Sequence, residues 1–226
     1  CNHPTSAALS GLTGLFAYEG GEPLGFGHSH MDYVSGYLGA VAVLDALLRR
    51  EITGNGDHVD IAMVECGVTL NGAQLLDWAI NGHVTRPMGN KSGALGAILQ
   101  GCYPCKGEDR WVVVTVRDSE NLRALEKTIG SKTGGSIQQL ESALRNWTET
   151  LDAWVVTREL QNAGVAAGVV SQGPDLAERD QHLTTRGGFS WITHAEIGTV
   201  PISQCAIFLD GRRLEVRTPA PLLAEH

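Results

Sequence analysis

The sequence predicts a mixed α/β fold, with a helical first part followed by a small α+β unit. Apolar residues recur at steps of three and four between residues 34 and 48, which is typical of an amphipathic helix. Two short runs, at 100–103 and 111–116, flank a turn-forming segment and are typical of paired strands. The 28 glycines against 8 prolines indicate many tight turns and close backbone approaches, as in a mixed fold with loops over a site.

The first 50 residues predict a short helix or turn, a loop and then one long helix. Small apolar residues fill positions 7–16, and the turn-forming segment 19–23 follows. The long helix is expected to run to about Arg50, because arginines are favourable at the negative C-terminal end of a helix dipole. One apolar stripe along this helix is expected to be buried. Its members are Val34, Tyr37, Leu38, Val41, Leu44 and Leu48.

Residues 53–101 predict a break, a short strand, a second helix and a long loop. Glycines at 54 and 56 interrupt the helical pattern, and the alternation at 58–61 favours a short strand. A second helical pattern extends from about Met63 to Ile80. The glycine-rich stretch 85–101 is longer than a simple connection, and loops of that length are usually functional or mobile.

The rest of the chain predicts a small α+β unit and a return segment. Its expected elements are strands at 100–103 and 111–116 around a turn at 106–109, helices around 118–128, 136–145 and 148–163, a strand at 165–171, a helix opening at Pro174, strand within 187–209 and an extended end from Thr218. We therefore expect a small α+β domain at 98–172, preceded by the segment 1–97 and followed by the segment 173–226.

Composition and charge exclude several classes of protein. The chain has 226 residues, of which 42% are hydrophobic, enough for one large domain or two small ones with their own cores. A net charge of −8 lacks the basic footprint that nucleic-acid binding requires. The sequence has no run of eighteen apolar residues, so no membrane partner is expected. Five cysteines at irregular spacing favour a reducing, cytoplasmic environment over a disulfide framework.

Two short arginine pairs are the main basic clusters of the chain. Each of Arg49-Arg50 and Arg212-Arg213 has an acidic residue close by, so we expect solvated surface charge at both. An anionic small molecule could still find a local positive site.

Two patterns resemble metal or redox sites but are expected to be structural. Cys102-Tyr-Pro-Cys105 is a CxxC motif on a predicted hairpin arm rather than at a helix N-terminus, and the other cysteines form no second pair. His28, His30 and Asp32 would point the same way from an extended segment, but no clear further ligand follows. We therefore expect no metal site and no cofactor.

Asp32 is the most informative residue, because it places one carboxylate at the mouth of the long helix. Aspartate is among the best helix N-cap residues, so a purely structural role fits the pattern well. The same position also suits chemistry: the N-terminus of a helix favours a negative charge, and a positioned carboxylate can attack an acyl carbon. Residues alone leave both roles open.

Several short motifs recur in a characteristic order along nearly the whole chain. They are Ala8-Leu9-Ser10-Gly11 with Thr13-Gly14, Asp32 with Gly36, Thr53-Gly-Asn-Gly56 followed by Val59-Asp60-Ile61, Arg86 with Gly89-Asn90, Tyr103-Pro-Cys-Lys-Gly107, and Ala220-Pro-Leu-Leu with Glu225-His226. In order and spacing these motifs are similar to those of the class III coenzyme A transferases, the group that includes formyl-CoA transferase and α-methylacyl-CoA racemase.

The resemblance implies a fold, a reaction and a site. The fold would be part of a Rossmann-like large domain plus a small α+β domain, within an intertwined dimer. Residues 1–97 would be the C-terminal part of the large domain, with the catalytic helix and the glycine-rich loop, and 173–226 would return to it after the small domain at 98–172. The reaction would move CoA from an acyl-CoA donor to a small carboxylic acid through an intermediate on Asp32, with the CoA thioester as substrate and no further cofactor. Substrate contacts would come from the glycine-rich loop, at Gly89, Asn90, Gly93 and Gly96.

The resemblance also leaves alternatives. Family chains are usually nearly twice as long, so the N-terminal half of the large domain would come from elsewhere, in a homodimer or a complex with a chain that supplies it. A non-catalytic subunit that retains the fold is the second option. A 2-methylacyl-CoA racemase is the third; it is disfavoured because Asn2 stands where the racemases have a catalytic histidine, with His3 one position away.

Overall fold

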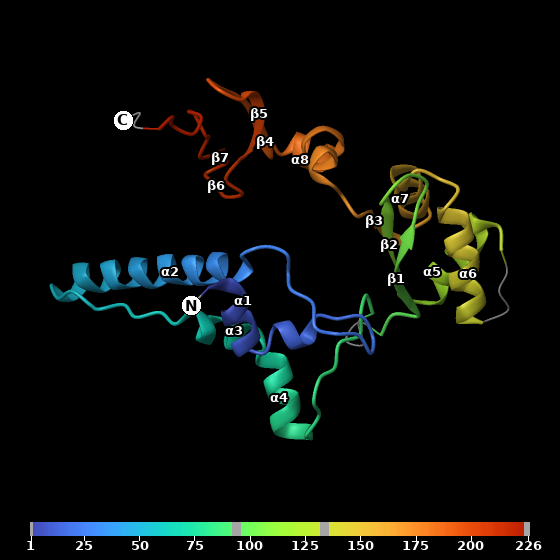
Figure 1. The fold of residues 1–226 in the computed structure, drawn as a ribbon, viewed down its shortest axis with the longest axis horizontal. Coiled ribbons are helices and arrows are strands. Elements are labelled where there is room, and N and C mark those ends of the chain that lie inside the picture. The colour runs from blue at the N-terminus through green and yellow to red at the C-terminus, as the bar shows by residue number, and fades with distance from the viewer. Residues whose placement is uncertain (1, 92–95, 132–135, 224–226) are drawn as a thin grey trace. The chain divides into compact units, whose positions relative to one another are not determined.

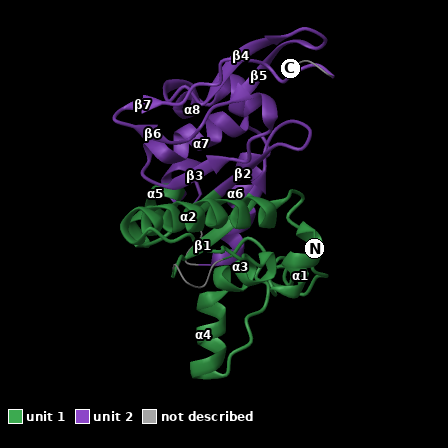
Figure 2. Cartoon of the chain, turned by 90° about the vertical axis from the view of Figure 1, so that its left-hand side faces the viewer, with its two compact units in different colours: residues 1–102, 114–125 green, residues 103–113, 126–226 purple. Residues whose placement is uncertain are grey.

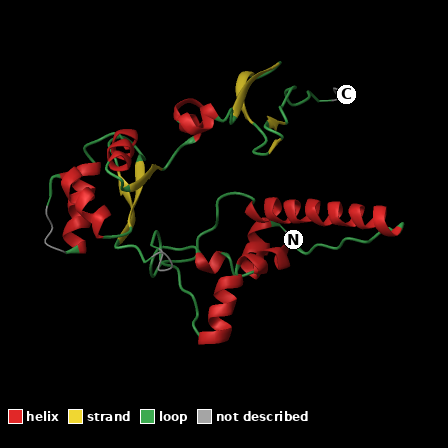
Figure 3. Cartoon of the chain, turned by 180° about the vertical axis from the view of Figure 1, so that it is seen from behind, coloured by secondary structure: helices red, strands yellow, loops and turns green. Residues whose placement is uncertain are grey.

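The computed structural model describes residues 2–91, 96–131 and 136–223, and these form the predicted mixed α/β chain (Figure 1). Within these ranges helices occupy the chain up to β1 at Leu99, and every strand follows from there (Figure 3). Two compact units divide the chain (Figure 2). The first comprises residues 1–102 and 114–125, and the second comprises 103–113 and 126–226.

The helices of the first unit meet at the start of its longest helix. They are α1 (His3–Leu9), the short 3-10 helix η1 (Thr13–Leu15), α2 (His30–Thr53), α3 (Met63–Leu70) and α4 (Gly72–Asn81). Met31, at the start of α2, is fully buried and lies in one cluster with Ala7, Leu12 and Cys66. Figure 1 shows α1 and α3 beside the N-terminal part of α2, while the rest of α2 extends beyond them.

The prediction of a long helix is confirmed, but the prediction that its apolar stripe is buried is wrong. Val41, Leu44 and Leu48 are 64%, 60% and 61% exposed, because the described helices cover only the first turns of α2. By length and composition alone, α2 could cross a membrane, a test that core helices of globular proteins also pass. Val34, at the start of the stripe, packs against the cluster around Met31, but no described residue buries the stripe beyond it.

Two further predictions for the first unit need correction. The predicted helix from Met63 to Ile80 is two helices, because the chain breaks at Asn71, whose side-chain amide donates to the Ser10 carbonyl at 2.6 Å. The short strand predicted at 58–61 is absent from the described structure, where residues 55–62 are irregular. An alternating sequence becomes a strand only when a neighbouring strand pairs with it.

The predicted hairpin and the helices that follow it are confirmed. The elements are β1 (Leu99–Pro104), β2 (Trp111–Val116), α5 (Ser119–Ile129), α6 (Ile137–Thr148), α7 (Ala153–Asn162) and β3 (Ala166–Val169). The strands form one sheet in the order β1-β2-β3. Backbone bonds from Ile98 to Val116 and from Cys105 to Arg110 close the two ends of the hairpin.

The last segment contains short helices and two small antiparallel sheets. Its elements are η3 (Asp175–Arg179, a π-helix turn), α8 (Gln181–Thr185), β4 (Phe189–His194), β5 (Gly198–Ser203), β6 (Phe208–Leu209) and β7 (Arg212–Arg213). Pro174 caps η3, as the sequence predicted, and Phe189 pairs with Ser203 across the β4-β5 ladder. Asp210 and Gly211, with φ of 48° and 74°, make the tight turn of the β6-β7 hairpin. The division at residues 97 and 172 stays a prediction.

Candidate functional site

The N-terminus of α2 places Asp32 in its first turn rather than at its cap. The N-cap is Ser29, whose side chain makes no capping bond, and the helix begins at His30. The backbone N–H of Asp32 donates to the Ser29 carbonyl at 3.1 Å, while the side chain of Asp32 is exposed. Asp32 is therefore not the N-cap residue, which removes the structural role that the sequence favoured. Its carboxylate lies at the positive end of the helix dipole.

The cap of α2 comes from His3, 28 residues away in the sequence. The backbone N–H of Met31 donates to His3 Nδ1 at 3.0 Å, which satisfies one of the free N–H groups at the helix start. Because Nδ1 accepts this bond, the proton of the neutral ring is on Nε2. Asn2, the neighbour of His3, accepts from Thr5 N at 3.3 Å and caps α1 instead.

Close packing of three helices fixes this arrangement. A Cβ atom added to Gly67 in α3 would collide with the Ser10 side chain and lie 2.9 Å from Met31 Cε. Glycine at this position therefore allows α3 to approach both α1 and the first turn of α2. On the other side, the Ser35 hydroxyl donates to the Met31 carbonyl at 2.7 Å. The first turn of α2, which carries Asp32, is thus fixed by the packing of Met31 against α3 and by the Ser35 hydrogen bond.

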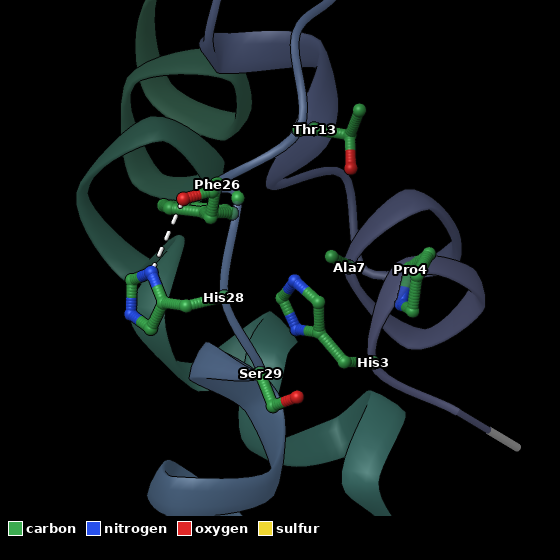
Figure 4. Close-up of a pocket in the computed structure, with 9 residues that line it drawn as sticks. His3, Pro4, Ala7, Thr13, Phe26, His28 and Ser29 are labelled. Atoms are coloured by element: carbon green, nitrogen blue, oxygen red, sulfur yellow. Dashed lines mark hydrogen bonds between the residues drawn. The ribbon is translucent and has the colours of Figure 1, made fainter.

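A pocket of about 350 Å³ lies at this end of α2 (Figure 4). Its lining includes His3, Pro4 and Ala7 of α1, Thr13 of η1 and His28 of the loop that enters α2. The lining ends at Ser29, so Asp32 follows it by three residues and lies outside it. A volume of this size is at the lower end for ligand pockets and suits an acyl group or a small acid.

Phe26 lines the pocket and lies at the centre of a cluster of aromatic rings. Phe26 lies 4.0 Å from Phe16 and 5.1 Å from His30, measured between ring centroids, and it stacks on His30. His28 Nδ1 is 3.1 Å from the Phe26 carbonyl, which orients that ring beside the cavity (Figure 4). The pair His28 and His30, considered as metal ligands from the sequence, thus belongs to this aromatic cluster, and His28 also lines the pocket. Within the described ranges, no three His, Cys, Asp or Glu side chains are placed to hold a metal ion.

The glycine-rich loop is described only in part, and Gly93 lies outside the described residues. Gly89 has a positive φ of 60°, and an added Cβ would be 3.7 Å from Glu19 N. Lys91 follows Asn90, and its Nζ is 3.3 Å from Glu19 Oε2. Gly96 also has a positive φ, of 57°. The described contacts of this loop are thus with residues 18–19; they do not bring it to Asp32.

The strongest electrostatic arrangement lies in the second unit, around the buried Asp175. Arg110 Nη1 donates to Asp175 Oδ2 at 2.8 Å, and the backbone N–H of Gln172 donates to the same oxygen at 3.0 Å. The bond from Arg110 lowers the pKa of Asp175 to about 2, helped by the Gln172 amide and opposed by burial. These partners are 65 residues apart, and no motif in the sequence indicated the pair. Its role is structural.

A model of CoA-transferase family III matches residues 2–226, almost the whole chain and including Asp32. The chain belongs to CoA-transferase family III. The resemblance drawn from the motifs is therefore confirmed. The matched range holds both the α1-α2-α3 junction and the pocket beside it.

Among curated relatives, the chain is 28% identical to a probable CoA-transferase, Rv1866, of Mycobacterium tuberculosis over 226 residues. That match covers 88% of this chain and 28% of the relative. It is 24% identical to the formyl-CoA:oxalate CoA-transferase of Streptomyces avermitilis, covering 97% of this chain and 59% of that one. It is also 24% identical to the alpha subunit of the succinyl-CoA–L-malate CoA-transferase of Chloroflexus aurantiacus, a match that covers 86% of this chain and 48% of that subunit. The chain thus spans between 28% and 59% of the length of these relatives.

Solved structures show the same fold. A CAIB/BAIF family protein from Brucella suis superposes with a TM-score of 0.85 at 19% identity, covering 100% of this chain and 60% of that one. Rv3272 from M. tuberculosis gives a TM-score of 0.72 at 19% identity, covering 100% and 62%. These neighbours confirm the predicted fold class.

Proposed function

We propose that this chain carries the nucleophile of an enzyme that moves CoA between an acyl-CoA and a small carboxylic acid. The observation that carries the proposal is the position of Asp32 in a chain of CoA-transferase family III. Its carboxylate is exposed, it is not used as the N-cap, and it lies three residues beyond a pocket of about 350 Å³. This arrangement suits a nucleophile better than a purely structural carboxylate.

In the proposed reaction, an Asp32 oxygen attacks the thioester carbonyl of the donor, and CoA leaves as a thiolate. The resulting mixed anhydride is attacked by the thiolate at the Asp32 carbonyl, which releases the donor acid and forms an aspartyl-CoA thioester. The acceptor carboxylate then attacks this thioester and expels the CoA thiolate, which gives a second mixed anhydride. The thiolate attacks the acceptor carbonyl of that anhydride, which forms the new acyl-CoA and releases the Asp32 carboxylate. Each step exchanges one acyl bond for another, so no redox partner or metal is needed.

The described residues support this chemistry in three ways. The first turn of α2 offers a positive helix end beside the charge that develops on the attacked carbonyl oxygen. His3 holds that turn through Met31, which keeps Asp32 in place. The pocket is large enough for an acyl group but not for the whole of CoA, so the nucleotide would lie outside it.

The glycine-rich loop is proposed to contact the substrate through Gly89, Asn90, Gly93 and Gly96. Positive φ at Gly89 and Gly96 lets the backbone turn where a side chain would be strained. A loop of this kind would keep water from both aspartyl intermediates, which would otherwise hydrolyse.

The full site is proposed to need more protein than these 226 residues. The apolar face of α2 is exposed, and the chain covers only 60% of a solved relative whose fold it shares. We therefore propose an intertwined homodimer, or a complex with a chain that supplies the remaining part of the large domain, in the cytoplasm. Light scattering after size-exclusion chromatography would report the mass of the assembly, for this chain alone and with a chain that supplies the remaining part; a monomer at all concentrations in both experiments would contradict both forms.

Trapping of the covalent intermediate tests the proposal. The protein, alone and with any partner chain, is exposed to a panel of acyl-CoAs and examined by peptide mass spectrometry. We expect a CoA or acyl adduct on Asp32 and its loss in Asp32→Asn, with transfer slower by about a thousandfold or more. Asp45→Asn is the matched control, because Asp45 is also an exposed aspartate of α2. A folded protein that transfers CoA in the Asp32→Asn form would refute the assignment.

A racemase is the second candidate, favoured by one observation. His3, rather than Asn2, lines the pocket beside the Asp32 turn, so a histidine is present where an acid or base would act. Exchange of the α-proton of a 2-methylacyl-CoA in deuterated water would reveal this activity, and His3→Asn would abolish it. Neither exchange nor transfer, and no calorimetric heat with CoA esters, would instead favour a non-catalytic subunit.

A further inference from the structure

A second cavity, of about 890 Å³, lies in the second unit between the end of α8 and the β6-β7 hairpin. Four arginines line it: Arg186, Arg212, Arg213 and Arg217. Glu215 is the single acidic residue of the lining, so the cavity is strongly positive in a chain whose net charge is −8. Neither the family match nor any named relative assigns this cavity a role.

Two of the arginines, Arg186 and Arg213, make contacts that connect the parts of the cavity wall. Arg213 donates through Nη2 to the Arg186 carbonyl at 2.6 Å and through Nη1 to the Gly187 carbonyl. The guanidinium groups of Arg186 and Arg213 lie 4.9 and 4.5 Å from the centre of the Phe208 ring. Cation–π contacts of this kind hold the two positive charges close together despite their repulsion.

The other two arginines are available to a ligand. Arg212 and Arg217 are exposed, and neither takes part in an ion pair within the described ranges. Their guanidinium groups can each present two parallel N–H donors to an oxyanion. The solvated charge predicted for Arg212-Arg213 thus fits Arg212, whereas Arg213 is held by two backbone carbonyls and the Phe208 ring.

Two buried donors in the cavity wall lack an acceptor. Gln204 Oε1 accepts from Val216 N at 3.0 Å, which leaves its Nε2 as a donor, and this Nε2 has no partner in the described chain. Arg213 Nε is likewise buried and without a partner there. Unpaired buried donors favour an occupant rich in acceptor oxygens over an apolar one.

We propose that this cavity binds a phosphate group, with Arg212 and Arg217 as its principal contacts. The phosphate could belong to a free anion or to a larger molecule such as CoA, since both offer the same tetrahedral oxyanion. The proposal goes beyond the proposed function and does not depend on it, because its measurement is binding and not transfer.

Calorimetric titration of the full chain with pyrophosphate at low ionic strength tests the proposal. In Arg212→Gln/Arg217→Gln we expect the dissociation constant to rise by about tenfold or more, as charge-assisted bonds are lost. The matched control is Arg50→Gln/Arg123→Gln, which removes the same charge from exposed arginines outside the cavity and should leave the constant unchanged. Circular dichroism verifies that both variants are folded.

The outcomes separate the sources of the phosphate. If Arg212→Gln/Arg217→Gln weakens the binding of both CoA and pyrophosphate, the phosphate is that of CoA. If it weakens only the binding of pyrophosphate, the phosphate is a separate anion. Both results support the site. No heat with millimolar pyrophosphate, equal weakening in the control variant, or binding of succinate as tight as that of pyrophosphate would each overturn the proposal. An adduct on Asp32 is measured independently, so failure of one proposal does not resemble failure of the other.

Discussion

Residues 3–81 and residues 99–179 bury their apolar side chains to very different extents. In the second region, Leu140 and Leu144 of α6 are 1% and 0% exposed. In the first, Leu44 and Leu48 of α2 are 60% and 61% exposed. Both helices have the periodicity of an amphipathic helix, so the difference lies in what covers them. The second region contains the elements that close its core, whereas the first presents a helix whose partner surface is not among the described residues.

This contrast shows why a sequence pattern can predict a helix without predicting what packs against it. The pattern of α2 specifies a helix with one apolar side, and burying that side is what normally stabilises such a helix in water. The N-terminal turns achieve this through Met31, and the later turns do not. The part of α2 that holds Asp32 is therefore the best-packed part.

Truncation of one leucine in each region gives the largest expected effect. Leu144→Ala should lower the free energy of unfolding by about 2–5 kcal/mol, because it leaves a cavity in a closed core. In the isolated, monomeric chain, Leu44→Ala should change it by less than about 0.5 kcal/mol, because the Leu44 side chain is 60% exposed there. Urea denaturation measures both. A comparable loss in the two variants would show that a further segment or partner covers α2, and it would break the contrast.

Acidification should act on the second region through Asp175. Its pKa is about 2 in the fold against 3.8 for the free side chain, so its stabilising effect is complete above pH 3.8 and lost as pH falls through 2. The loss should be at most about 2 kcal/mol, since water screens part of the interaction. Asp175→Asn should remove this acid-dependent step in unfolding monitored by circular dichroism; Asp45→Asn, at an exposed position of α2, is the control. An unchanged pH profile in Asp175→Asn would contradict the assignment.

Two glycines of the first region test whether its helix junction is tight. Gly67→Ala should destabilise the protein by about 1–2 kcal/mol, because the new methyl group meets the Ser10 side chain and Met31. Gly72→Ala, in the neighbouring helix, meets no atom within 4 Å and should be neutral or slightly stabilising. Thermal melting compares the two. If Gly67→Ala raised the melting temperature as well, the helices around Gly67 would pack less closely than described. This packing would then not fix the position of Asp32.

Part of the candidate site could be predicted and part could not. Asp32 was identified because a carboxylate before an amphipathic pattern is a local signal, and the motif order added the family. His3 could not be assigned to the site from its neighbours, because its bond to Met31 joins residues 28 positions apart. His28 was considered as a metal ligand and judged to be an ordinary loop histidine, and its place beside Phe26 in the pocket lining was not predicted. The strand at 58–61 failed for a related reason: alternation indicates a strand, but pairing requires a partner that the sequence does not locate.

The sequence by itself determined the long helix α2, the β1-β2 hairpin and the helices that follow it, because each depends on residues close together in the chain, and the order of its motifs determined the family. Only the tertiary structure decided that Asp32 lies in the first turn and not at the cap, that His3 holds that turn, that Arg110 meets Asp175, and that the face of α2 is uncovered. These features depend on which distant segments pack together. That choice is set by the fit of whole surfaces, which no local pattern specifies.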